Sequence, residues 1–179
     1  MPTFSAFVAS IQNSVTTVGT GYLTMQESSG STVCNSTDCG SVSTNSATCS
    51  TFNKYGGHLT TVPGQTVTTT IPIKNSGTVD ATTFTLTPGA CTRSTNGTLN
   101  GSATALCPKL DLVIKGGSGG GTTIFTGTAA DLASGGAVNV LAPLAAVTAS
   151  TSVPISVSVT LDSRAGPTYQ GPAVSQPLT

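Results

Sequence analysis

Two long stretches of the chain alternate between apolar and polar residues. In TVTTTIPIKN (66–75), Val67, Ile71 and Ile73 alternate with threonine, proline and lysine, and in TSVPISVSVTLDS (151–163) every second residue from Val153 to Leu161 is apolar. A period of two puts one set of side chains on each face of a pleated strand, so both segments are predicted to be β-strands with one buried face. Pro72 has no backbone N–H and predicts an edge or a bulge.

Shorter patterns predict further strands. Residues 19–26 are expected to form a strand, and residues 81–89, which follow the turn NSG at 75–77, are expected to form a hairpin with 66–75. Other strands are expected at 106–115, 122–127 and 137–143, with a helical turn at 129–135 and a polyproline II tail or irregular edge strand at 166–179.

About seven or eight strands separated by turns predict an all-β fold, a β-sandwich of the jelly-roll or immunoglobulin-like kind. The chain has 179 residues, enough for one domain of ordinary size, and its lysine, glutamate and arginine content is too low to favour helices. We expect a single sandwich domain over 13–179, preceded by a separate N-terminal strand at 1–12. Within the domain, 27–50 lacks periodicity and is predicted to be a polar loop held by disulfides.

The N-terminal stretch FSAFVASIQNSV (4–15) is apolar at a position where chains are usually frayed and polar. It is too short to cross a bilayer and lacks the features of a signal peptide, so we take the chain to be the mature form of an exported protein. As an extended strand it has apolar residues on both faces: Phe4, Ala6, Phe7, Val8, Ala9 and Ile11. A neighbouring subunit can bury both faces, which predicts a donor strand that completes the next subunit's sheet. The alternative is that the segment folds back as the first strand of its own sandwich.

The five cysteines indicate disulfides of an exported protein, because they lack the C-x-x-C spacing of a zinc site. Cys91 and Cys107 enclose a loop with two Asn-Gly turns and are predicted to pair. Cys34–Cys49 is the favoured second bond because it closes the polar loop, although Cys39–Cys49 would close nearly as much of it. Cys39 is then the odd thiol, left free or paired outside the chain.

Composition and motifs give little support to catalysis or charged partners. Charged residues make up 7% of the chain and the net charge is 0, which argues against nucleic acid and anionic membranes as partners. The chain has one histidine, His58, and neither a HExxH nor a GxSxG motif, and its aspartates do not have calcium-loop spacing. We therefore expect neither an enzyme nor a bound metal or cofactor.

Two segments resemble a known family. SAFVASIQNSVTTVGTGYLTM near the N-terminus and VTTTIPIKNSGTVDATTFTL further on are similar to the start and to the strand–turn–strand region of TasA/camelysin-like proteins. The resemblance covers roughly 4–26 and 66–87. It implies a secreted jelly-roll subunit of extracellular matrix fibres that passes its N-terminal strand into the next subunit. Some members are described as metalloproteases, but this sequence has no zinc-ligand motif.

These observations together predict a structural subunit of an extracellular filament, biofilm-matrix or pilus-like, that polymerises head to tail. Its partner would be a second copy of the chain, with other matrix or cell-surface components as further candidates and no membrane insertion. The alternative is a monomeric secreted β-sandwich that acts as an adhesin or cell-surface binding module. Filaments in electron micrographs would distinguish the first from the second.

Overall fold

The computed structural model describes residues 17–50, 52–117, 121–141 and 146–179. Within these residues the protein is all-β apart from three short helical segments. The strands are β1 (Met25–Ser29), β2 (Thr32–Asn35), β3 (Thr66–Asn75), β4 (Thr85–Leu86), β5 (Thr92–Ser94), β6 (Leu110–Gly116), β7 (Thr122–Thr128), β8 (Val138–Asn139), β9 (Ser152–Leu161) and β10 (Ala173–Ser175). The helical segments are the 3-10 turns η1 (Cys107–Lys109) and η2 (Pro167–Tyr169) and the α-helix α1 (Ala129–Gly135).

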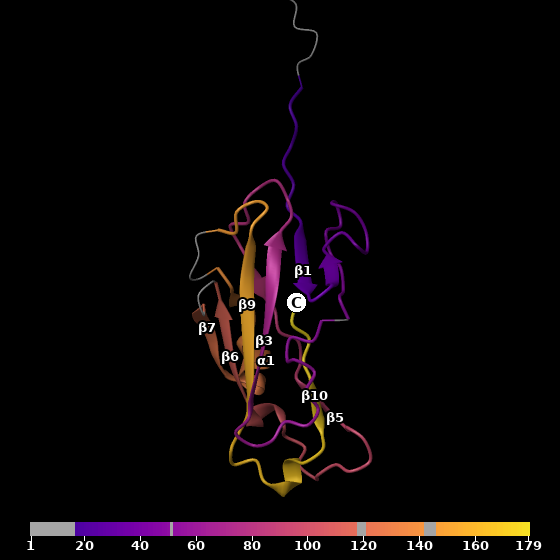
Figure 1. The fold of residues 1–179 in the computed structure, drawn as a ribbon, viewed down its shortest axis with the longest axis vertical. Helices are drawn as coiled ribbons and strands as arrows, with labels where there is room; N and C mark the ends of the chain where they lie inside the picture. Colours follow the sequence, from indigo (N-terminus) through magenta and orange to yellow (C-terminus); the bar gives the residue numbers. More distant parts are fainter. Residues whose placement is uncertain (1–16, 51, 118–120, 142–145) are drawn as a thin grey trace, which may run out of the picture.

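A six-stranded antiparallel sheet in the order β2-β1-β3-β9-β6-β7 forms the main layer (Figure 1). The two ten-residue strands β3 and β9 lie side by side at its centre, with Thr66 opposite Thr160 and Lys74 opposite Ser152. The alternation of threonine or serine with valine or isoleucine on both strands gives the sheet one hydroxyl-rich face and one apolar face.

The short strand pairs β4/β8 and β5/β10, together with α1, cover the apolar face of the main sheet. Leu112 and Ile114 of β6 and Leu132 of α1 are fully buried there. The capping box of α1 begins at Thr128, whose hydroxyl accepts the Asp131 N–H while the Asp131 carboxylate accepts the Thr128 N–H. A second, smaller cluster of Leu106, Leu161 and Ala165 fills one end of the layer.

The strongly alternating segments form strands where the sequence predicts them. The strands at 66–75 and 151–163 are confirmed as β3 and β9, and the helical turn at 129–135 is confirmed as α1. The predicted strand at 106–115 begins only at Leu110, because Pro108 lies in the 3-10 turn that precedes it. The strong periodicities therefore located the centre of the main sheet.

The predicted hairpin between 66–75 and 81–89 is wrong. Residues 81–89 leave the main sheet, and Thr85 and Leu86 of β4 pair with β8. The side chain of Asn75, 2% exposed, redirects the chain: it donates hydrogen bonds to the carbonyl oxygens of Val79 and Val147 and accepts the Gly77 N–H. The three hydrogen bonds of this buried amide thus fix the path of the chain from the main sheet to the second layer.

Two further predictions near the N-terminus are wrong. The strand expected at 19–26 begins at Met25, and the stretch at 27–50 is not wholly a loop, because Ser29 opposite Thr32 closes a hairpin of β1 and β2 within it. The turn uses Gly30 at φ 57°, a left-handed conformation that favours glycine. Residues on this hairpin are mostly exposed or half-buried, so it has no apolar face and no alternating pattern.

Candidate functional site

The side of β3 that faces away from β9 is only partly covered. β1 pairs with β3 from Ile73 to Asn75, and no strand among the described residues pairs with 66–72 on that side. The ladder between β1 and β3 ends at Ile73, one residue before Pro72. In the ladder on the other side of β3, Pro72 lies opposite Pro154 of β9. Two facing prolines cannot exchange N–H···O bonds, so this is a non-hydrogen-bonded pair and the Pro72 nitrogen points to the open side.

The alternation of an antiparallel ladder then gives the direction of the other backbone groups. Thr66, Thr68 and Thr70 have the same parity as Pro72, so their N–H and C=O groups point to the open side. Their side-chain hydroxyls form hydrogen bonds to hydroxyls of β9, with oxygen–oxygen distances of 2.7, 2.8 and 3.2 Å to Thr160, Ser158 and Ser156. Within the described residues these N–H groups have no protein partner, and such an unpaired row is a template for another strand.

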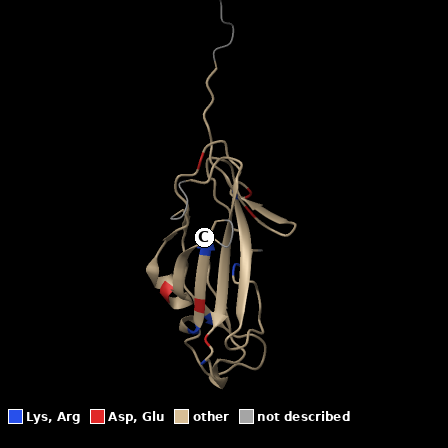
Figure 2. Ribbon diagram, turned by 60° about the vertical axis from the view of Figure 1, so that its left-hand side comes forward, with Lys and Arg blue, Asp and Glu red and all other residues tan. Residues whose placement is uncertain are grey.

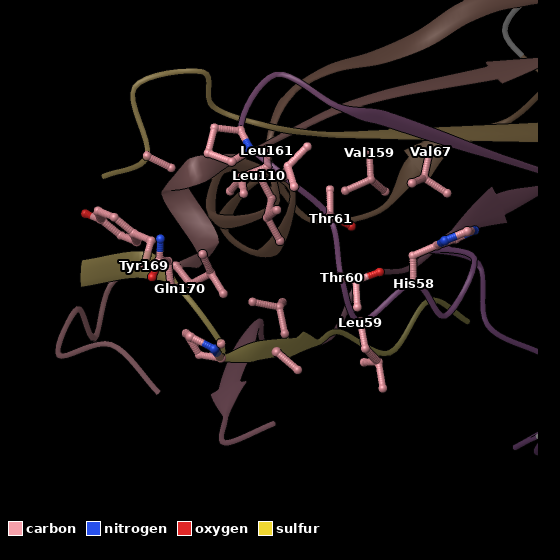
Figure 3. A pocket seen from close by; sticks show the side chains of 18 of the residues that line it. His58, Leu59, Thr60, Thr61, Val67, Leu110, Val159, Leu161, Tyr169 and Gln170 are labelled. Carbon is pink, nitrogen blue, oxygen red and sulfur yellow. The ribbon is translucent and has the colours of Figure 1, made fainter. Parts of the chain in front are cut away.

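A groove lies between the apolar face of the main sheet and the second layer, beside this open edge. One part is a cavity of about 430 Å³ that Val67, Val159 and Leu161 line from the sheet, with residues 58–62 as one wall and Tyr169 and Gln170 as another (Figure 3). The other part is a cavity of about 690 Å³, lined by Ile71 and Ile73 from the sheet. Asn53, Tyr55 and Val174 line both cavities, so the two parts are contiguous.

Tyr55 spans the groove at the boundary between the cavities. Its hydroxyl donates a 2.5 Å hydrogen bond to Gln176 Oε1 in the second layer, and the Gln176 amide donates to the Gly89 carbonyl. Burial raises the pKa of the Tyr55 phenol above its ordinary value of 10.0. The turn that carries Tyr55 needs Gly56, at φ 81°, since a Cβ there would lie 2.7 Å from Thr69 Oγ1.

Two covalent or ionic contacts hold the loop that borders the larger cavity. Cys34 of β2 is bonded to Cys49, with the two Cα atoms 6.2 Å apart. Lys54 forms an ion pair of 2.6 Å with Glu27 of β1, and both side chains are less than one-fifth exposed. The loop is therefore anchored to the β1–β2 hairpin.

The structure contains both predicted disulfides. Cys91 is bonded to Cys107 with a Cα separation of 6.1 Å, which ties the chain just before β5 to the start of η1. Cys34 pairs with Cys49, and Cys39 is a free, exposed thiol. The predicted donor-strand residues Phe4, Ala6, Phe7, Val8, Ala9 and Ile11 lie outside the described residues.

The described chain begins at one pole of the molecule and points away from it (Figure 1). Residues 17–20 are all exposed, with Val18 at 97%. The first tertiary contacts follow at Tyr22, whose carbonyl accepts the N–H groups of Thr78 and Val79. The open edge of β3 is nearer the other pole, because β3 runs from Thr66 towards the end at which the described chain begins (Figure 1).

The described residues contain no cluster of three or more histidine, cysteine or acidic side chains that could hold a metal ion. His58 is exposed and lines the smaller cavity, where its neighbours are mainly apolar and hydroxyl side chains (Figure 3). No helix in this part of the chain has the length and apolar character needed to cross a membrane.

The sequence predicted an edge or a bulge at Pro72, but it gave neither the extent of the open edge nor the role of Tyr55. The edge had a signal, because Pro72 and Pro154 occupy the same phase of their two alternating patterns and are directly opposed once β3 and β9 pair. The partner of Tyr55, Gln176, is 121 residues away, so no local pattern could have identified it.

The sequence matches no protein-family model, and it matches no curated protein.

Proposed function

We propose that this chain is the structural subunit of an extracellular filament, a jelly-roll or immunoglobulin-like sandwich that polymerises head to tail by donor-strand exchange. In this mechanism residues 4–11 of one copy add as a strand to β3 of the next copy. The observation that carries the proposal is the unpaired stretch of β3 at 66–72, which lies beside an apolar groove.

The lengths and chemistry of donor and acceptor agree. The open stretch of β3 has seven residues, and the apolar segment at the N-terminus has eight. The N–H groups of Thr66, Thr68 and Thr70 offer hydrogen bonds to an added strand, and the groove offers apolar walls to one face of it. Strand addition would thus supply partners for the backbone N–H groups of β3 and bury apolar side chains of the added strand.

The energies are of the right order for association. Full burial of Phe4, Phe7, Val8 or Ile11 contributes about 1.5–3 kcal/mol each. Association of two proteins costs about 4–15 kcal/mol in lost freedom and ordering. The groove buries one face of the added strand, so one pair of these side chains, either Phe4 and Val8 or Phe7 and Ile11, contributes about 3–6 kcal/mol, and with the backbone hydrogen bonds this offsets the lower part of that range.

The separation of the two ends explains why the product would be a filament. The described chain leaves the molecule at one pole, and the open stretch of β3 lies towards the other (Figure 1). A contact between two different surfaces is heterologous and does not close on itself, so it can be repeated without limit. The two disulfides are typical of an oxidising, extracellular compartment, and the resemblance to TasA/camelysin-like fibre proteins implies the same location.

Deletion of residues 2–11 tests the proposal, with electron microscopy and sizing chromatography as measurements. We expect filaments from the full chain and a folded monomer from the deletion variant. The matched control is Val18→Ser, which changes an apolar residue that is 97% exposed and lies outside the donor segment; this variant should still form filaments.

Three results would contradict donor-strand exchange. An unfolded deletion variant would mean that 4–11 is the first strand of its own domain. Filaments from a folded deletion variant would mean that another surface drives assembly. Isolated particles from the full chain would favour the monomeric binding module.

A further inference from the structure

The outward face of the main sheet carries a regular array of small hydroxyl side chains. Thr66, Thr68 and Thr70 of β3 lie opposite Thr160, Ser158 and Ser156 of β9, and each pair is joined by a hydroxyl–hydroxyl hydrogen bond. In both strands these residues alternate with less exposed ones, Val67, Thr69 and Ile71 in β3 and buried apolar residues in β9, so all of them point away from the core.

The array continues over the two remaining strands. Asp111, Val113 and Lys115 of β6 lie opposite the three β9 residues, and Thr128, Thr126 and Thr123 of β7 lie opposite those of β6. The face is thus a grid of three rows and four columns, in which every position except the three on β6 is serine or threonine. Asp111 and Lys115 are its only charges, in the first and third rows of one strand.

Of the other charges near the grid, Asp131 of α1 accepts a hydrogen bond from the hydroxyl of Thr128 at the first-row corner, and the rest are paired or lie beyond the grid. Lys109, just before β6, forms a 2.8 Å ion pair with Asp162. Lys74 of β3 lies two rows past the third row, next to Ser152. The ribbon as a whole carries few charges (Figure 2). Asp111 and Lys115 are therefore the only two charged residues of the grid itself, and they have opposite signs.

We propose that this face binds the same face of a second copy, with the strands of the two copies antiparallel. A two-fold axis that runs across the strands through the middle row stacks β6 on β6. It brings Asp111 of each copy opposite Lys115 of the other, and Val113 opposite its own counterpart. A two-fold axis that runs along the strands, between β9 and β6 at the centre of the grid, would instead stack β6 of one copy on β9 of the other. Asp111 and Lys115 would then both face hydroxyl groups. Charge complementarity thus selects the antiparallel arrangement.

The side chains suit a close, dry contact between sheets. Serine and threonine lose little rotamer freedom on burial, and their hydroxyls are already bonded in pairs across β3 and β9. The described grid has no aromatic side chain, so it lacks the stacking platform with which flat protein faces usually hold sugars or bases. A second copy is the occupant that its charges and shape fit.

The size of the face indicates a weak contact. With strands about 4.8 Å apart and a rise of about 3.3 Å per residue, the grid measures about 14 by 13 Å between outer Cα positions. With side-chain margins this gives on the order of 400 Å² per copy, half of the roughly 800 Å² per partner that stable interfaces bury. Such a contact becomes strong only when it is repeated, as it would be along two adjacent filaments. Here the inference rests on the proposed function, and it predicts lateral pairing of antiparallel filaments.

Charge reversal tests the pairing. In Asp111→Lys, a lysine faces Lys115 of the other copy, and we expect electron micrographs to show single filaments where the wild type shows bundles. In the double variant Asp111→Lys/Lys115→Asp the pairs are restored with opposite signs, so bundles should return. Bundles from Asp111→Lys, or none from the double variant, would overturn the proposal, while normal single filaments in all three would leave the donor-strand mechanism intact.

Cross-linking tests the same contact in soluble subunits, whether or not filaments form. In a Cys39→Ser background, Val113→Cys places a thiol next to the two-fold axis, and a short bismaleimide should link it to its counterpart at high protein concentration. The control Thr66→Cys faces Thr70 of the other copy, about 13 Å from its own counterpart along the strand, and should link at least several-fold less. Equal yields from the two variants would contradict the antiparallel pairing.

Discussion

Tyr55 donates a 2.5 Å hydrogen bond to Gln176 across 121 residues of sequence, and this contact joins the loop beside β3 to the second layer of the fold. Tyr55 lines both cavities of the groove, so the contact lies at their boundary. Because the phenol is partly buried, the contact also makes the stability of the protein dependent on alkaline pH.

We expect Tyr55→Phe to lower the free energy of unfolding by about 1 kcal/mol, the usual net value of one hydrogen bond, and the Tm by about 2–4 °C. Tyr22→Phe is the control, since that side chain is 44% exposed. An unchanged Tm for Tyr55→Phe in thermal unfolding would mean that the contact with Gln176 does not stabilise the fold.

The same residue predicts a loss of stability at high pH. Burial raises the pKa of Tyr55 in the folded state above its ordinary value of 10.0, so above about pH 10 the unfolded chain binds fewer protons than the folded one. Its contribution to the free energy of unfolding is therefore constant below pH 10 and decreases above it. Urea unfolding between pH 9 and 11 should show a steeper decrease for the wild type than for Tyr55→Phe. Parallel curves would contradict the raised pKa.

The edge of β3 can be blocked by a single proline. Thr68→Pro removes an N–H that points to the open side, so we expect a folded subunit that no longer polymerises. Thr69→Pro is the matched control: its N–H belongs to the ladder with β9, opposite Val157, and its loss should destabilise the fold by about 3 kcal/mol or more. Circular dichroism and electron microscopy measure the two effects. A folded Thr68→Pro variant that forms normal filaments would exclude β3 as the acceptor.

The two faces of β9 should respond differently to charge. Val157 is 2% exposed, between Thr69 of β3 and Ile114 of β6, and Val157→Asp would bury an unpaired carboxylate. We expect this variant to give no soluble folded protein. The next residue, Ser158, points outward, so Ser158→Asp should retain a cooperative melting transition. A normal melting curve for Val157→Asp would mean that the assignment of the two faces is wrong.

One disulfide should stabilise the whole fold, and the other should stabilise mainly one loop. Removal of Cys91–Cys107, which closes a 16-residue separation next to the core, should cost about 3 kcal/mol of global stability. Removal of Cys34–Cys49 should mainly increase hydrogen exchange in residues 36–50, because that loop lies outside the core. Cys39 alone should be alkylated in the native protein without reductant. Equal global losses for the two bonds would contradict this distinction.

The sequence by itself determined the strands that are buried on one face. Val157 lies in strict alternation with serine and threonine, and Ile71 alternates with Thr70 and Pro72; a period of two predicts a two-faced strand whatever its neighbours are. The sequence also predicted the helical turn at 129–135, which is α1, and it favoured both disulfides, because each closes a polar loop.

Only the tertiary structure decided which strands pair and where pairing stops. The chain after β3 could have returned as a hairpin, but the amide of Asn75 is satisfied by carbonyls from two distant segments and directs it to the other layer. Likewise, Pro72 indicates an edge on its own, yet it becomes the limit of the β1 ladder only because Pro154 lies opposite it. Strand pairing depends on long-range contacts whose strength is set by burial and by backbone hydrogen bonds, and neither is encoded in a local pattern.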